Sequence, residues 1–134
     1  IKWLLTPVLH TLSWLHKLTN YIGKQMTMMT LNDYIEDASK VSFISDIYAD
    51  RMTEWVLVDA EVCYYSSLLD KARDEKDKEG YRSAYDNMTD ALSKLWKTEK
   101  FMPRSEIDNA QQQLYVMRSQ RAEDRFNEWK KRNG

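Results

Sequence analysis

The stretch WVLVDAEVCYY, residues 55–65, decides how this chain folds, because it is apolar around most of a helical circumference. When successive residues are placed about 100° apart, Trp55, Val58 and Val62 share one face, whereas Leu57 and Tyr64 point nearly the opposite way. A helix of this kind either lies at the centre of a bundle or contacts a second protein through its other face. Both interpretations stay open at this stage.

The surrounding sequence extends this segment into one long helix. From Ser42 onward, apolar residues recur at steps of three and four, and no helix breaker appears before Gly80. The pattern predicts a helix over about residues 42–78, which at 1.5 Å per residue would be roughly 54 Å long. The apolar positions that define it are Ile44, Ile47, Tyr48, Met52, Trp55, Val58, Val62, Tyr65, Leu69 and Ala72.

Two shorter helices are expected before this long one. The first covers residues 7–22 and ends before Gly23, which is well suited to a helix C-terminus. The second covers residues 31–39, where Thr30 and Asp33 have the spacing of an N-terminal cap.

Two further helices are expected after the long one, separated by Pro103. The first runs from about 81 to 101, with an apolar stripe made of Tyr81, Tyr85, Met88, Leu92, Leu95 and Trp96. Ser105 is placed to cap the second, whose stripe consists of Ile107, Ala110, Leu114, Met117, Phe126 and Trp129.

These elements predict an all-α protein. Three glycines and two prolines among 134 residues are too few for the turns of a β-sandwich. The expected fold is an elongated helical bundle, with the long helix at 42–78 packed against two antiparallel helices and the N-terminal helices. Residues 1–32 contain three lysines and no acid. We therefore expect two parts, a basic apolar N-terminal helix at 1–25, appended or processed, and a bundle domain at 26–134.

The composition excludes most catalytic chemistry. His10 and His16 lie six residues apart, about 240° around a helix, so they cannot join one metal site. Cys63 is the only cysteine, and the chain has no glycine-rich phosphate loop. We expect no enzyme activity, no metal and no cofactor. The single cysteine and the lack of a run of about 20 apolar residues are consistent with a soluble, cytoplasmic protein.

Charge patterning is the remaining signal, because the net charge is only −1. On the long helix an acidic stripe is formed by Asp46, Asp50, Glu54 and Glu61. The last helix carries a basic stripe beside Phe126 and Trp129, formed by Arg118, Arg121, Arg125 and Arg132. The two stripes can be solvated or can pair with each other, or the arginines can bind a phosphate backbone or an acidic partner.

We therefore expect a non-catalytic protein–protein interaction module that self-associates and acts as an accessory or regulatory protein. Its expected partner-binding residues are Leu57, Tyr64, Arg118, Arg121, Arg125, Trp129 and Arg132. One alternative is a regulator that binds nucleic acid through the arginine-rich last helix. Another is an accessory protein of the phage or plasmid type, attached to a membrane or a larger assembly through its basic N-terminal helix.

Overall fold

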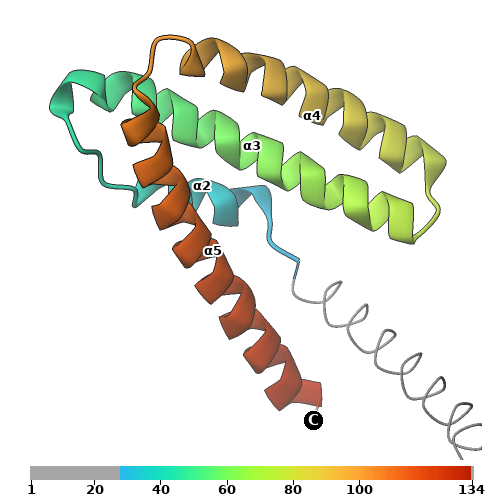
Figure 1. Cartoon of the computed structure of the whole chain (residues 1–134). Helices are drawn as coiled ribbons and strands as arrows, with labels where there is room; N and C mark the ends of the chain where they lie inside the picture. Colours follow the sequence, from blue (N-terminus) through green and yellow to red (C-terminus); the bar gives the residue numbers. More distant parts are fainter. Residues whose placement is uncertain (1–27, 134) are drawn as a thin grey trace, which may run out of the picture. The chain divides into compact units, whose positions relative to one another are not determined.

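The computed structural model describes residues 28–133, and its only regular elements there are helices. They are α2 (Leu31–Ser39), the 3-10 turn η1 (Asp46–Tyr48), α3 (Ala49–Asp74), α4 (Lys78–Glu99) and α5 (Arg104–Asn133), as Figure 1 shows. The predicted all-α fold is confirmed. The helix predicted at 7–22 lies outside the described residues.

The described residues belong to two compact units. Met29–Arg121 form one, here called the bundle unit, while Met28 and the residues from Ala122 onward belong to the other, here called the terminal unit. Helix α5 begins in the bundle unit and ends in the terminal unit.

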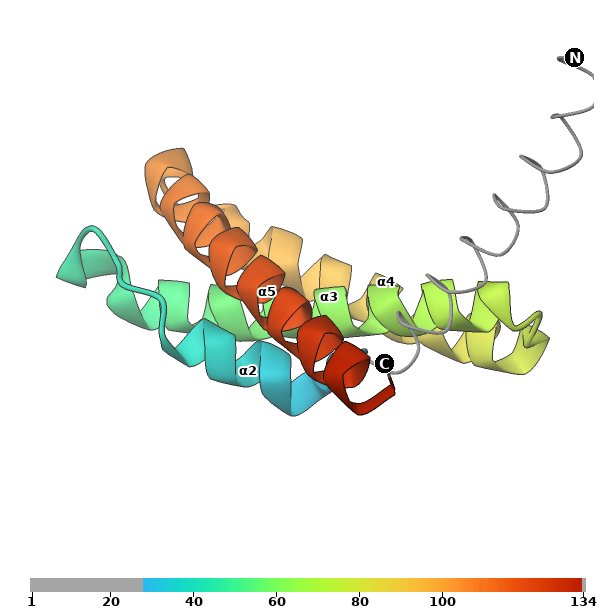
Figure 2. The same ribbon diagram turned by 90° about the horizontal axis from the view of Figure 1, so that it is seen from below.

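The core of the bundle unit is built around α3. Figure 1 places α3 between α4 and α2, and it packs on both. The first half of α5 lies across α2 and α3 (Figure 2) and contributes Ile107, Ala110 and Leu114 to the core. From α3 the core receives Met52, Trp55, Val56 and Ala60. The central position of α3 therefore explains the burial of Trp55, Val56 and Ala60, whereas Leu57 on another face of the same stretch is 40% exposed.

The long helix is shorter than predicted at its start. Helix α3 begins at Ala49 rather than Ser42, so its 26 residues span about 39 Å. The segment before it is held away from helical geometry by side chains of α5. Gln113 accepts a hydrogen bond from the Ser42 N–H at 2.8 Å and donates one to the Ser42 carbonyl at 2.7 Å. The buried Glu106 carboxylate accepts from the N–H groups of Ile44 and Ser45 at 3.2 and 2.9 Å.

The turn between α3 and α4 also differs from the prediction. Helix α3 ends at Asp74, and Lys76 has the left-handed φ of 58° that reverses the chain. Asp77 then caps α4 by accepting from the Gly80 N–H at 3.0 Å. Gly80 therefore lies in the first turn of α4 and does not end α3. A Cβ atom at Gly80 would collide with the capping carboxylate, so the glycine leaves space for this cap.

The short helix α2 has the predicted N-terminus. The Asp33 N–H donates to the Thr30 hydroxyl at 3.2 Å, and the Thr30 N–H donates to the Asp33 carboxylate at 2.8 Å. This reciprocal pair is a capping box.

The start of α5 differs from the prediction. Helix α5 begins at Arg104, directly after Pro103, so Ser105 lies inside its first turn and is not its cap.

Candidate interaction surfaces

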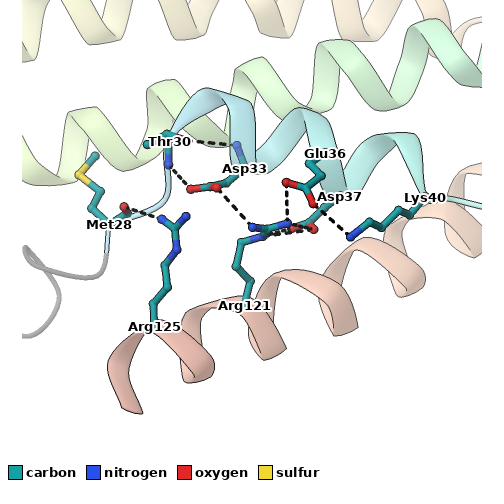
Figure 3. A network of polar contacts seen from close by, with 8 residues as sticks. All are labelled: Met28, Thr30, Asp33, Glu36, Asp37, Lys40, Arg121 and Arg125. Carbon is teal, nitrogen blue, oxygen red and sulfur yellow. Dashed lines mark hydrogen bonds and ion pairs between the residues drawn. The ribbon is translucent and has the colours of Figure 1, made fainter. Parts of the chain in front are cut away.

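Arg121 of α5 is surrounded by three carboxylates of α2 (Figure 3). Its Nη2 atom lies 2.8 Å from Asp37 Oδ1, and its Nε atom donates to both Asp37 oxygens at 3.1 and 3.2 Å. Its Nη1 atom donates to Asp33 at 3.3 Å, and Nη2 lies 3.5 Å from Glu36. The Asp37 side chain is only 4% exposed. Arg121 therefore joins the C-terminal half of the bundle unit to its first helix.

The electrostatics of this cluster favour the charged guanidinium. Hydrogen bonding to Asp37 raises the pKa of Arg121, and the charges of Asp37, Glu36 and Asp33 act in the same direction. Asp33 also belongs to the capping box, so one residue serves both the start of α2 and the contact with α5. The guanidinium of Arg121 is thus already paired with carboxylates of its own chain.

Arg118, one helical turn earlier, enters a second polar cluster. Its Nη2 atom lies 2.9 Å from Asp59 Oδ2, and its Nη1 atom donates to Cys63 Sγ at 3.2 Å. The guanidinium lies over the Tyr34 ring, 5.2 Å from the centroid. The Cys63 thiol in turn donates to Asp59 at 3.9 Å. This cluster joins α2, α3 and α5 within the bundle unit.

Burial determines the protonation of this second cluster. Desolvation raises the pKa of Asp59 by more than Arg118 lowers it. Burial and the neighbouring Asp59 charge raise the pKa of Cys63 to about 11. A thiol with so high a pKa stays protonated near neutral pH, and the thiolate is the nucleophilic form. The arrangement is that of a half-buried structural thiol.

The carboxylates that meet these arginines are not those of the predicted acidic stripe. Arg118 and Arg121 pair with Asp59 and with acids of α2, whereas Asp46, Asp50 and Glu54 are exposed. A sequence signal for the true partners does exist. Asp33 and Asp37 are spaced four residues apart, on one face of α2, and Asp59 lies inside the most apolar stretch of the chain.

The other predicted residues of α5 lie in the terminal unit. Arg125 donates from Nη1 to the Met28 carbonyl at 3.2 Å (Figure 3). Trp129 stacks on Phe126 with ring centroids 5.8 Å apart, and the Lys130 ammonium lies 5.1 Å from the Phe126 centroid. Arg132 is exposed. The four arginines thus have different surroundings and do not form one uniform basic surface.

Leu57 and Tyr64 lie on one face of α3, separated by about two helical turns. Leu57 is 40% exposed. Tyr64 is half-buried, and its ring lies 5.5 Å from that of Tyr65. Only Leu57 of the two is exposed, so this face offers a small apolar contact area.

Helix α4 carries a larger exposed apolar face along the stripe that the sequence predicted for it. We call it the α4 stripe, and it consists of Tyr81, Tyr85, Met88, Leu92 and Trp96. Tyr81 is 39% exposed, Tyr85 50% and Trp96 64%, while Met88 and Leu92 are half-buried. Leu95, expected in the same stripe, is buried instead. The face of α4 that carries Leu95 packs on α3, and the α4 stripe lies beside this contact.

The described part of the chain offers little for other classes of site. Among residues 28–133, no group of three His, Cys, Asp or Glu side chains could hold a metal ion. No helix within that range combines the length and the hydropathy that a membrane span requires. Comparison of the chain with protein-family models, with curated proteins and with solved structures finds no match. The exposed surfaces of the helices therefore carry the evidence for function.

Proposed function

We propose that this chain is a non-catalytic helical module that acts by protein–protein contact and self-associates, as an accessory or regulatory protein. The observation that supports this most strongly is the exposure of Tyr81, Tyr85 and Trp96 along one side of α4. Large apolar side chains grouped on a small protein mark contact surfaces, and aromatic residues supply most of the binding energy at such surfaces.

The surroundings of the arginines favour a protein partner over nucleic acid. Phosphate binding requires arginines whose charge is available to the backbone. Arg118 and Arg121 are already paired with carboxylates of the same chain, and Arg125 donates to a backbone carbonyl. Only Arg132 of the predicted basic stripe is exposed, and the other three arginines are half-buried. The overall charge of −1 adds no attraction for a polyanion.

A photo-crosslinking experiment tests the proposal. A benzophenone amino acid is placed at Tyr85 in the α4 stripe or, as the matched control, at the exposed Tyr115 of α5. We expect the probe at Tyr85 to give an adduct of discrete mass with a protein, either this chain or another, and Trp96→Glu to abolish it. The probe at Tyr115 should give no such adduct.

Two results would contradict the proposal. One is equal, diffuse crosslinking from both positions. The other is nucleic-acid binding at physiological salt that is lost on Arg132→Glu and unchanged by Trp96→Glu, since this would assign function to the basic residues of α5.

A further inference from the structure

We propose that the α4 stripe binds a second copy of this chain, with the two α4 helices antiparallel about a two-fold axis near Met88. This inference rests on the proposed function and adds the identity and the orientation of the partner. It follows from the order of side chains along the stripe and from the charges at its two ends.

The side chains of the stripe are arranged symmetrically about its middle. Tyr81 and Trp96 lie equally far from the centre, which is next to Met88, and Tyr85 and Leu92 are also equally spaced from it. In an antiparallel pair, Tyr81 therefore faces Trp96 of the second copy, and Tyr85 faces Leu92. The two Met88 side chains meet near the axis. A two-fold interface requires this kind of self-complementary surface.

The charges at the ends of the stripe select the antiparallel orientation. Lys78 precedes Tyr81 by three residues and Glu99 follows Trp96 by three, so helical spacing places both on the side of the stripe. Antiparallel packing brings Lys78 of each copy toward Glu99 of the other. Parallel packing would instead put like charges together, and it would also align the two helix dipoles.

Both end charges can form these contacts. Lys78 makes no ion pair among the described residues of its own chain. Glu99 accepts a hydrogen bond from Trp55 Nε1 on Oε1 at 3.1 Å. A carboxylate has lone pairs on two oxygens, so it can accept from a lysine as well.

The expected dimer is weak and depends on concentration. Helix α4 has 22 residues and is about 33 Å long, and only part of that length carries the stripe. A contact between two such helices lies at the lower end of specific interfaces, on the order of 1,000 Å² in total. We therefore expect monomer and dimer to exchange at micromolar concentrations.

Cysteine crosslinking tests the geometry directly. In a Cys63→Ala background, which removes the only native thiol, Met88→Cys should form a disulfide-linked dimer under mild oxidation because the two side chains meet at the axis. Asn87→Cys, exposed on another side of α4, is the matched control and should stay monomeric. Tyr81→Cys should crosslink to Trp96→Cys in a mixture and should not crosslink to itself.

A second measurement does not depend on oxidation. Light scattering of the unmodified chain should show a mass that rises with concentration toward twice the monomer mass of 16.0 kDa. Lys78→Glu should raise the dimer dissociation constant roughly two- to tenfold, because two exposed ion pairs are lost. Circular dichroism of each variant confirms that it remains helical.

The possible failures are distinguishable. A chain that stays monomeric at high concentration, or crosslinks Tyr81→Cys to itself, overturns the antiparallel dimer. If Tyr85 nevertheless crosslinks to a different protein, the proposed interaction function stands and only the identity of the partner is wrong. If neither assay responds to changes in the stripe, both proposals fail.

Discussion

Arg121 Nη2 lies 2.8 Å from Asp37 Oδ1, although the two residues are 84 positions apart in the sequence. This contact closes the bundle unit by tying α5 to α2. Both side chains are largely removed from water, so each needs the other to compensate its charge. The arginine predicted to bind a partner therefore has an internal structural task.

Replacing Arg121 should destabilise the protein strongly. Arg121→Met leaves the buried Asp37 carboxylate, and Asp33 beside it, without the guanidinium. Removal of one member of a buried pair costs several kcal/mol, and the partial exposure of Arg121 reduces this to about 2–3 kcal/mol. The free energy of unfolding in urea measures the loss. Arg132→Met is the matched control and should change it by less than about 0.5 kcal/mol. Equal effects of the two substitutions would show that the ion pairs of Arg121 do not add to the free energy of unfolding.

Glu106 should be needed to hold the segment that precedes α3. The residue is 3% exposed, and its carboxylate accepts from the backbone N–H groups of Ile44 and Ser45. Glu106→Ala removes both acceptors, at a cost of about 2 kcal/mol, and frees those two amides to exchange. Hydrogen exchange read at Ile44 and Ser45 is the direct measurement. Protection that persists at both amides would contradict this role. Glu123→Ala, an exposed change on the same helix, should leave both amides protected.

The Cys63 thiol should make stability fall at alkaline pH. Its pKa is about 11 in the folded protein, above the ordinary value of 9.0, because burial disfavours the thiolate. The folded state therefore holds its proton more tightly than the unfolded state. The associated stability is fully present below pH 9 and is lost as the pH rises toward 11.

A comparison with Cys63→Ala isolates this contribution. The difference in unfolding free energy between the native chain and the variant should shift in favour of the variant between pH 9 and 11. Alkylation of the native thiol by iodoacetamide should also be slow at pH 8, compared with the urea-unfolded chain. Rapid alkylation of the folded protein at that pH would mean that the thiol is not held in its protonated form.

The N-terminal cap of α2 should contribute measurably to stability. Thr30→Ala removes the hydroxyl that accepts from the Asp33 N–H, and loss of such a cap costs about 1 kcal/mol. Thr53→Ala is a suitable control, because its exposed hydroxyl only donates to the Ala49 carbonyl within α3. Thr30→Ala should therefore lower the melting temperature, and Thr53→Ala should leave it unchanged. Thermal unfolding of the two variants measures both values. Equal melting temperatures would show that the capping box is dispensable.

Local sequence signals predicted the elements well where the relevant contacts are also local. The capping box at Thr30 and Asp33 was readable because its two hydrogen bonds join residues three apart. The start of α3 was not, because the residues that hold Ser42 and Ile44 out of a helix lie more than 60 positions away on α5. Local signals also failed to predict the ion-pair partners of Arg118 and Arg121, because these carboxylates lie on α3 and α2, far away along the chain.

The exposure of side chains along α4 also separates what local spacing predicts from what the packing of helices decides. Helical spacing placed Tyr81, Tyr85 and Trp96 in one stripe, and the structure keeps them on one side of α4. Spacing alone cannot say whether a stripe is covered, since burial depends on where the other helices lie. Leu95, in the same predicted stripe, is covered by α3, whereas Trp96 beside it is 64% exposed.

By itself the sequence determined the helical class, the approximate helices and the apolar circumference of residues 55–65, because backbone propensity, capping and side-chain periodicity act over a few residues. Only the tertiary structure decided which acid pairs with Arg121, why α3 starts at Ala49 and which side chains of the α4 stripe are exposed. These features depend on side chains that are distant along the chain and meet only after the helices pack, where burial sets the energy of each charge and each apolar contact.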